Sequence, residues 1–305
     1  MEKSAGIIGL GIMGSAMAES LMRDGYRVAG YDLLAARRQA HRRAGGVVAR
    51  TCRDAAKFAP VLITSLPSSE ALLETATTLA GCGRSGQVVI ETSTLPISAK
   101  QQARKRLARR GITLLDCPLS GTGAQARVKD VVVFASGDRA AYRRAAPVLD
   151  GFARARHYVG AFGCGSKMKF VANLLVAIHN VAAAEALVLA MKAGLDPAMT
   201  LKVICDGAGS SRILQVRGPM MVAGDYSAAT MKMKVWQKDM AVIGEFARDL
   251  ACPTPLFAAT APLYNAAMAM GRGAEDTASV CAVLEQMANS PRRKTGIRSR
   301  RGLVP

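Results

Sequence analysis

The stretch Ala5-Gly6-Ile7-Ile8-Gly9-Leu10-Gly11-Ile12-Met13-Gly14 decides the fold of this chain. A short apolar strand runs directly into a Gly-x-Gly-x-x-Gly turn. A helix then extends to about Arg23, and a second strand over residues 27–31 is followed by Asp32. A strand, a glycine-rich turn, a helix and an acid some 20 residues further on are the signature of a dinucleotide-binding βαβ unit. A purely structural tight turn is the alternative, and the complete series favours nucleotide binding.

Each glycine of this turn has a physical role. Gly9 permits the tight turn, Gly11 lets the backbone approach a pyrophosphate, and Gly14 lets the helix pack closely on the sheet. The pyrophosphate binds at the helix N-terminus, where free N–H groups and the helix dipole favour an anion. We therefore expect these residues to bind the cofactor: Gly9, Leu10, Gly11, Ile12, Met13, Gly14 and Asp32.

Apolar strands and helices continue to alternate up to about residue 162. Further strands are expected over 61–65, 88–90, 112–115, 131–135 and 157–159. Continuous apolar strands between helices indicate a parallel sheet covered on both faces. The predicted fold class is therefore α/β, a Rossmann-type doubly wound, mainly parallel sheet followed by an all-α domain. Ligands bind beyond the carboxyl ends of such strands. That edge carries four more expected cofactor contacts: Leu66, Pro67, Ser93 and Thr94.

The strand pattern stops at Gly163, and the remaining sequence is helical in pattern. A long apolar helix runs towards Gly194, and shorter helices are expected over 197–205, 213–222, 232–248, 255–270 and 275–288. We expect three parts. They are a dinucleotide-binding Rossmann domain (1–162), an all-helical domain for substrate binding and oligomerisation (163–290), and a basic, disordered tail (291–305).

Lys169 and Asn173 lie four residues apart near the start of the long helix. They therefore share one helix face, and that face is otherwise apolar. A lysine that extends to solvent from a helix start is the simpler interpretation. The nucleotide-binding pattern upstream favours a site instead.

The chain is strongly basic, with a net charge of +19. A basic patch can bind nucleic acid. However, the basic clusters, between Lys100 and Arg110 and between Arg292 and Arg301, contain no aromatic residue. A solvated helix face and a polar tail explain them better, so a nucleic-acid partner is not expected.

The cysteine and histidine positions indicate no metal site. Seven cysteines are scattered without a Cys-x-x-Cys pair, and the three histidines fit neither a triad nor a metal motif. Reduced thiols and the lack of a signal-peptide pattern predict a cytoplasmic protein. The most apolar segment, 170–191, carries polar residues such as Asn173 and Asn180. A buried helix is therefore favoured over a membrane span.

Four motifs in order resemble the β-hydroxyacid dehydrogenases, the family of 3-hydroxyisobutyrate dehydrogenase and tartronate semialdehyde reductase. The glycine-rich turn matches the cofactor motif. Asp-Cys-Pro-Leu-Ser-Gly-Thr over 116–122 resembles the substrate loop, and Gly163-x-Gly165-x-x-x-Lys169-x-x-x-Asn173 matches the catalytic motif. Lys238-Asp239 resembles a Lys-Asp pair of the second domain, which is of the 6-phosphogluconate dehydrogenase type. The resemblance covers about residues 4–288.

This resemblance implies an NAD(P)-dependent oxidoreductase. It would interconvert a small 3-hydroxy acid and the corresponding semialdehyde or keto acid by hydride transfer. Lys169 would be the general acid/base, and Lys238 would contact the cofactor or lower the pKa of Lys169 by its charge. A surface pair with Asp239 is the alternative for Lys238. The substrate would be bound by Ser120, Gly121, Thr122 and Asn173.

Several positions around the substrate depart from the family pattern. Thr122 replaces a glycine, Gln125 and Lys129 stand where glycines are usual, Ala172 replaces an asparagine, and Met231 stands where phenylalanine is common. The identity of the hydroxy acid and the physiological direction therefore stay open. An imine reductase-like enzyme, whose relatives usually lack the lysine, and a non-enzymatic basic dinucleotide-binding module are the alternatives.

Asp32 favours NAD over NADP, because its carboxylate accepts hydrogen bonds from the ribose hydroxyls and would repel a 2′-phosphate. Arg37 and Arg38 follow closely and keep NADP open. The apolar surface of the second-domain helices exceeds what one small domain needs to bury. It predicts a homodimer or homotetramer.

Overall fold

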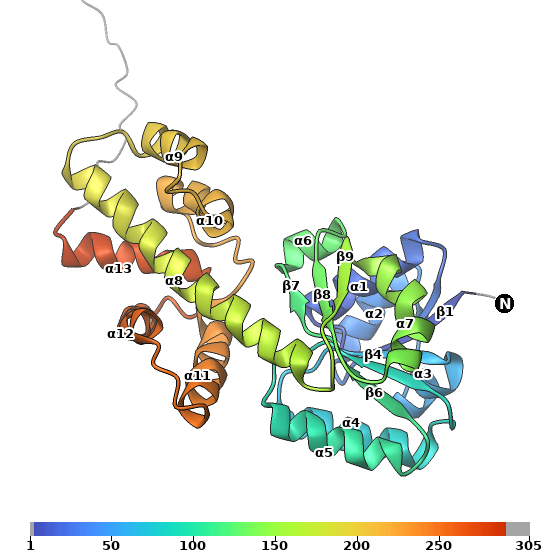
Figure 1. Cartoon of the computed structure of the whole chain (residues 1–305). Coiled ribbons are helices and arrows are strands. Elements are labelled where there is room, and N and C mark those ends of the chain that lie inside the picture. The colour runs from blue at the N-terminus through green and yellow to red at the C-terminus, as the bar shows by residue number, and fades with distance from the viewer. Residues whose placement is uncertain (1–2, 291–305) are drawn as a thin grey trace, which may run out of the picture. The chain divides into compact units, whose positions relative to one another are not determined.

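The computed structural model describes residues 3–290 (Figure 1). The tail over 291–305, expected to be disordered, lies outside the described residues. Residue contacts divide the described residues into a sheet unit, up to Leu175 together with Val235–Pro255, and a helical unit, Val176–Lys234 together with the residues from Leu256 onward. The helices α8 (Cys164–Lys192) and α11 (Met233–Asp249) each contribute to both units. The domain limits expected from the sequence stay a prediction.

The sheet unit is built on six parallel strands in the order β3-β2-β1-β4-β5-β6. Their bounds are β1 (Ser4–Ile8), β2 (Arg27–Tyr31), β3 (Val47–Val48), β4 (Val61–Thr64), β5 (Val88–Glu91) and β6 (Thr113–Asp116). Ile7 of β1 lies opposite Gly30 of β2 on one side and Ile63 of β4 on the other. The strand order reverses between β1 and β4, and ligands of such sheets bind at that point, beyond the carboxyl ends of the strands.

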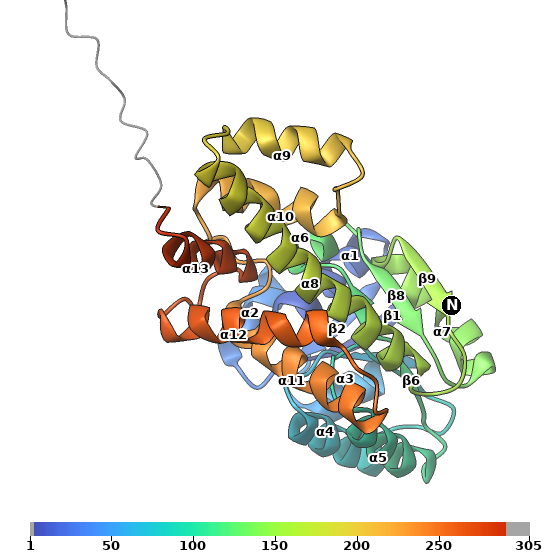
Figure 2. The same ribbon diagram turned by 60° about the vertical axis from the view of Figure 1, so that its left-hand side comes forward.

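Helices cover both faces of this sheet, so the strands are apolar on both sides. Ile7, Ile63 and Ile90 share a core with α1 (Ile12–Arg23) and α7 (Arg139–Phe152). Ile8, Leu62 and Val89 point the other way, since side chains alternate along a strand. They pack with α3 (Cys52–Phe58), α4 (Ser69–Cys82) and α5 (Ile97–Ala108). Helix α2 (Ala35–Arg43) follows β2. Figures 1 and 2 both show α4 and α5 side by side.

The strands expected over 131–135 and 157–159 do not extend the parallel sheet. They form a second sheet, in the order β7-β8-β9, from β7 (Leu119–Ser120), β8 (Val132–Ala135) and β9 (Ala155–Tyr158). β8 runs antiparallel to β7 and parallel to β9. Pro118 lies between β6 and β7 and has no N–H to donate to a ladder. A bridge between Asp116 and Ser136 connects the two sheets, and helix α6 (Gly123–Arg127) follows β7.

The helical unit contains the second half of α8, and α9 (Pro197–Asp206) packs on α10 (Arg212–Ala223) in both views (Figures 1 and 2). Helix α12 (Pro255–Ala269) precedes a short 3₁₀ turn (Thr277–Ser279), and α13 (Val280–Met287) ends the described chain. Inside this unit the buried Asn180 amide donates to Tyr264 Oη at 3.1 Å and to the Thr277 carbonyl at 2.9 Å.

Helix α8 is, by length and composition alone, the one helix among residues 3–290 that could cross a membrane. Its polar side chains argue for a different role. Asn173 and Asn180 are buried and donate hydrogen bonds to other parts of the protein. A buried amide needs such partners. The polar contacts therefore fit a core helix of a folded domain.

Candidate active site

The glycine-rich turn is shaped by its own packing. A Cβ on Gly9 would lie 2.1 Å from the Ser65 carbonyl oxygen, and one on Gly14 would lie 1.8 Å from the Gly9 carbonyl oxygen. Gly9 also has a φ of +95°, which L side chains rarely adopt. By contrast, no described atom lies within 4 Å of a Cβ built on Gly11. The fold therefore demands Gly9 and Gly14, whereas Gly11 faces open space that a cofactor could fill.

The N-terminus of α1 is suited to a phosphate. In the described chain no side chain caps this helix at Gly11, so its first N–H groups are available to an anion. Leu10 is buried, whereas Ile12 is 53% exposed. The first residues of α1 could therefore hold an anion such as a pyrophosphate.

Asp32 lies beyond the end of β2 and is nearly buried. Its carboxylate accepts hydrogen bonds from the Leu10 N–H at 2.8 Å and the Leu34 N–H at 2.9 Å. Arg37 Nη1 lies 3.2 Å from Asp32 Oδ2, and Arg38 Nη1 donates to the Asp32 carbonyl oxygen at 2.5 Å. Asp32 thus ties the glycine-rich turn to the second strand, and two arginines stand beside it.

Cofactor residues predicted at the ends of β4 and β5 are joined in one chain of hydrogen bonds. The Leu66 N–H donates to Ser93 Oγ at 2.8 Å, and the Ser93 N–H donates to both carboxylate oxygens of Glu91 at 3.0 and 3.1 Å. Lys238 Nζ, on α11, donates to the Thr94 carbonyl oxygen at 2.5 Å. The loops after β4 and β5 and the helix α11 therefore meet at the carboxyl edge of the sheet. Pro67 lies exposed in the same loop.

Lys169 is buried on α8, whereas Lys167 is exposed. Burial lowers the pKa of the Lys169 ammonium from 10.5 to about 8. The negative charge of Asp239 acts against this shift, and the positive charge of Lys238 adds to it. A lysine with a pKa near neutrality is able both to donate and to accept a proton.

Asn173, one turn after Lys169, is held by a partner that sequence reasoning left out of the site. Its Nδ2 donates to Asp239 Oδ2 at 3.0 Å, and Asp239 Oδ1 lies 3.3 Å from Lys238 Nζ. Asp239 is only 4% exposed. The Lys238-Asp239 pair therefore contacts Asn173 and the Thr94 loop, and its charges act on Lys169. The Lys-Asp motif in the sequence was the signal that could have identified Asp239.

The start of α8 is anchored on the two sheets. A Cβ on Gly165 would lie 2.4 Å from the Phe134 carbonyl oxygen, so this position admits only glycine. The Gly165 N–H donates to Ser136 Oγ at 2.9 Å. The Ser166 N–H donates to Asp116 Oδ2 at 2.8 Å, and Ser166 Oγ donates to Asp116 Oδ1 at 2.7 Å. These contacts satisfy N–H groups that a helix start leaves without partners.

Lys100 corrects the expectation of a solvated basic face on α5. Its side chain is fully buried, with Nζ 2.8 Å from Asp116 Oδ1 and 3.5 Å from Glu91 Oε2. Buried carboxylates need a counter-charge, which explains the position. Ala103 and Leu107 are buried three and seven positions later, so Lys100 lies on the apolar stripe of the helix. That periodicity was the missed signal.

The segment that follows the 116–122 loop packs closely on the glycine-rich turn. A Cβ on Gly123 would lie 2.2 Å from Ile12 Cγ2. The Thr122 N–H donates to Gln125 Oε1 at 3.0 Å, in a capping box at the start of α6. Gly121 has a φ of +136° and Lys129 one of +62°. Lys129 therefore has the left-handed backbone conformation that favours the glycine usual at this position in the family.

Known proteins resemble this chain over nearly its whole length. The family described as the NAD binding domain of 6-phosphogluconate dehydrogenase matches residues 4–163. The family described as NAD-binding of NADP-dependent 3-hydroxyisobutyrate dehydrogenase matches residues 163–284. L-threonate dehydrogenase of Cupriavidus necator is 34% identical over 284 residues, which are 92% of this chain and 95% of that enzyme.

Solved structures also resemble this chain over nearly its whole length. The crystal structure of 3-hydroxyisobutyrate dehydrogenase from Salmonella typhimurium matches with a TM-score of 0.84 and 29% identity, over 92% of this chain and 100% of that one. An imine reductase from Pseudomonas sp. matches with a TM-score of 0.60 and 21% identity, over 93% and 100% of the two chains. The second likeness is one of fold alone.

Proposed function

The chain belongs to the β-hydroxyacid dehydrogenase family of NAD(P)-dependent oxidoreductases, and from this premise we propose that Lys169 is its general acid/base. The reaction interconverts a small 3-hydroxy acid and the corresponding semialdehyde or keto acid. The observation that carries the proposal is the burial of Lys169, which brings its pKa to about 8. At neutral pH such a lysine is mostly protonated, with a neutral fraction that can accept a proton.

Residues of the sheet unit account for cofactor binding. The Gly9–Gly14 turn would hold the pyrophosphate, Asp32 the adenosine ribose, and the Leu66, Ser93 and Thr94 loops the nicotinamide end, with Lys238 beside them. When bound, the cofactor supplies hydride exchange at its nicotinamide. NAD is the preferred cofactor in this proposal, because the Asp32 carboxylate stands where a 2′-phosphate would bring further negative charge.

The protein's own part in the reaction is to orient the substrate and to move one proton. Lys169 Nζ takes the hydroxyl proton in oxidation and returns it in reduction. Asn173, whose Nδ2 is held by Asp239, presents its carbonyl oxygen to the lysine or the substrate hydroxyl. The substrate carboxylate is bound by backbone N–H groups of Ser120, Gly121 and Thr122, with Thr122 exchanging its Gln125 partner for the substrate.

A substrate panel tests this function. Small hydroxy acids, with L-threonate among them because a relative is named for it, are assayed with NAD and NADP beside aldehydes and imines. Turnover of hydroxy acids or of their carbonyl products supports the proposal. Turnover of imines alone would favour an imine reductase, against which Lys169 argues. Salt-dependent DNA binding without any turnover would favour a basic non-enzymatic module.

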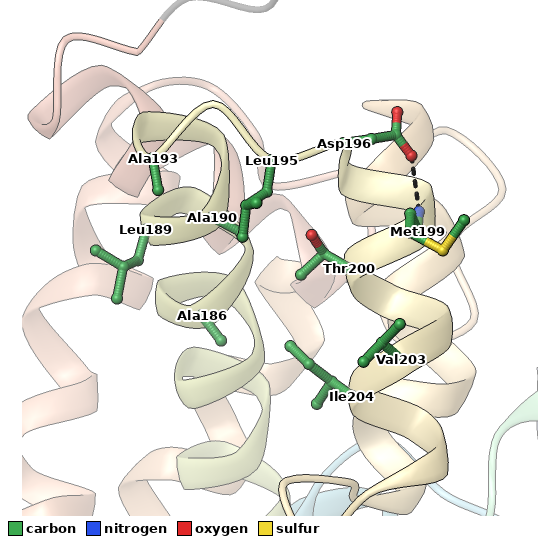
Figure 3. Close-up of a pocket in the computed structure, with 10 residues that line it drawn as sticks. All are labelled: Ala186, Leu189, Ala190, Ala193, Leu195, Asp196, Met199, Thr200, Val203 and Ile204. Carbon is green, nitrogen blue, oxygen red and sulfur yellow. Dashed lines mark hydrogen bonds between the residues drawn. The ribbon is translucent and has the colours of Figure 1, made fainter.

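The assembly in this proposal is a homodimer or homotetramer, and a groove in the helical unit motivates it. The groove measures about 670 Å³ and lies between α8 and α9 (Figure 3). Leu189, Met199 and Val203 line it, with exposures of 72%, 58% and 61%. None of the ten residues of α9, all in the described part of the chain, is buried. Short helices depend on packing for stability, so a further covering surface beside α10 would stabilise α9.

A second copy of this chain is the occupant we propose for that groove. The same unit exposes further apolar side chains, Leu256 and Met287, each at 69%, which a second copy could also cover. Light scattering at micromolar concentration tests the assembly, and a monomer alone would contradict it.

We place the protein in the cytoplasm, since no disulfide joins the cysteines within residues 3–290 and reducing compartments preserve thiols.

A further inference from the structure

A cluster of three ionisable side chains lies at the carboxyl ends of β5 and β6, next to the candidate site. Lys100, Glu91 and Asp116 are each fully buried. Lys100 Nζ lies 2.8 Å from Asp116 and 3.5 Å from Glu91. Each carboxylate stands at the carboxyl end of its own strand, β5 or β6, and Lys100 reaches both from α5. Two buried carboxyl groups thus share one positive partner.

The Asp116 side of the cluster holds the helix that carries Lys169. Both oxygens of Asp116 accept hydrogen bonds from Ser166, one from its N–H and one from its hydroxyl. Ser166 precedes Lys169 by three residues, about one helical turn. The position of Asp116 therefore sets the rotation and the height of the first turn of α8.

The Glu91 side of the cluster holds the loop on the cofactor side. Glu91 accepts two hydrogen bonds from the Ser93 N–H. The next residue, Thr94, accepts a hydrogen bond from Lys238, whose charge in turn acts on Lys169. Displacement of Glu91 would therefore move both the loop and the partner of Lys238.

We propose that Lys100 is a positioning residue for the reaction: it holds the Ser93–Thr94 loop and the first turn of α8 at the separation that proton transfer by Lys169 requires. Lys100 itself touches neither substrate nor cofactor. Without its charge, two buried carboxylates would face each other unscreened, and like charges in a shared site repel. The two anchored segments would then move apart. This inference rests on the proposed role of Lys169.

The test compares Lys100→Met with Lys105→Met, the same change at an exposed lysine of α5. Turnover is measured per cofactor-binding site, so that unfolded protein does not enter kcat. A displaced acid/base costs about 10-fold to 100-fold in kcat. Cofactor Kd should change by no more than about 3-fold, because the glycine-rich turn and Asp32 carry most of the phosphate and ribose contacts. Lys105→Met should behave as wild type.

The pH profile separates positioning from a merely structural role. The groups that act on Lys169 are Asp239 and Lys238 of α11, with the Asn173 amide on its own helix. Those that act on Lys100 are Asp116, Glu91 and the Cys117 thiol. A loosened α8 turn hydrates Lys169, and burial is the main cause of its low pKa. The limb of kcat/KM assigned to Lys169 should therefore move to higher pH in Lys100→Met.

A milder variant keeps the test decisive if Lys100→Met does not fold. Ser166→Ala removes one contact between α8 and Asp116 and leaves the buried ion pairs in place. It should lower kcat by about 3-fold to 10-fold and move the same pH limb upward, with cofactor Kd unchanged. Wild-type kcat and an unmoved limb in Ser166→Ala, or in folded Lys100→Met, would overturn the positioning role. Full activity of Lys169→Ala would instead overturn the proposed function.

Discussion

The side-chain amide of Asn173 donates a 3.0 Å hydrogen bond to the buried carboxylate of Asp239. This contact joins α8 to α11 one turn beyond Lys169. It also places a negative charge where it opposes the effect of burial on the Lys169 pKa. Asp239 therefore has two roles in the account: it orients Asn173, and it keeps the pKa of Lys169 from falling further.

Asp239→Asn should lower the pKa of Lys169 below its value of about 8. Loss of the carboxylate removes the charge of Asp239, which favours the ammonium form of Lys169, so oxidation should reach its plateau at lower pH. A shift of about one pH unit is expected for a charge this close. The pH dependence of kcat/KM for oxidation measures it. Asp249→Asn, at the exposed end of the same helix, is the control. An unmoved or alkaline-shifted limb would contradict the assignment.

Lys169→Met should stabilise the protein at pH 7 while it abolishes turnover. The ammonium has a pKa of 10.5 when unfolded and about 8 in the folded protein. A difference of this size corresponds to about 3 kcal/mol as an upper bound. The unfolded chain binds more protons between these two values, so wild-type stability rises with pH across that window. The advantage of Lys169→Met should therefore shrink from pH 8 to pH 10.5. Urea unfolding at a series of pH values checks this, and a variant less stable at pH 7 would refute it.

Gly11→Ala should fold normally and bind the cofactor weakly. A methyl group at Gly11 meets no described atom within 4 Å, but it projects where the pyrophosphate approaches the backbone. We expect the cofactor Kd to rise about 10-fold or more, which corresponds to at least about 1.4 kcal/mol. Fluorescence titration of the cofactor and a thermal melt measure the two effects.

Two further glycines serve as controls for that experiment. Gly81→Ala, on α4, also has open space around the new methyl group and should retain wild-type affinity. Gly14→Ala would bring its methyl group to 1.8 Å from the Gly9 carbonyl oxygen and should lower the melting temperature. Unchanged cofactor affinity in Gly11→Ala would place the pyrophosphate elsewhere.

Asp32→Asn should weaken the preference for NAD. The asparagine still accepts a hydrogen bond from the turn, but it no longer repels a 2′-phosphate. Arg37, now paired with Asp32 at 3.2 Å, would become available to that phosphate. The ratio of kcat/KM for NADP to that for NAD should rise about 10-fold. Wild-type enzyme that already prefers NADP, or a ratio that does not change, would show that Asp32 does not set the preference.

Relationships between neighbouring residues of the candidate site could be predicted from the sequence, whereas contacts between residues distant in the sequence could not. The glycine-rich turn lies within one βαβ unit, and Lys169 and Asn173 are one helical turn apart, so spacing alone related them. Two partners of the Asp116 carboxylate, Lys100 and Ser166, lie 16 and 50 residues away in the sequence. No local period relates such residues, and the surplus of basic residues concealed a lysine that is fully buried.

The shortest helices and strands were also not predicted from the sequence. Helix α6 has five residues and β7 has two, and segments of this length carry little periodicity. The antiparallel pairing of β7 with β8 depends on contacts across the chain. The occupation of the Thr122 N–H by Gln125 likewise depends on a capping geometry that the family comparison alone did not indicate, since both residues depart from the family pattern.

Steady-state kinetics of Lys169→Ala beside Lys167→Ala, with a cofactor titration of each, test whether Lys169 is the general acid/base. Lys167 is two residues away and exposed, so it controls for loss of positive charge at the start of α8. If Lys169 moves the proton, its alanine variant loses about 100-fold or more in kcat and keeps its cofactor Kd, whereas Lys167→Ala stays near wild type. Wild-type turnover in Lys169→Ala, or an equal loss in both variants, would contradict the account.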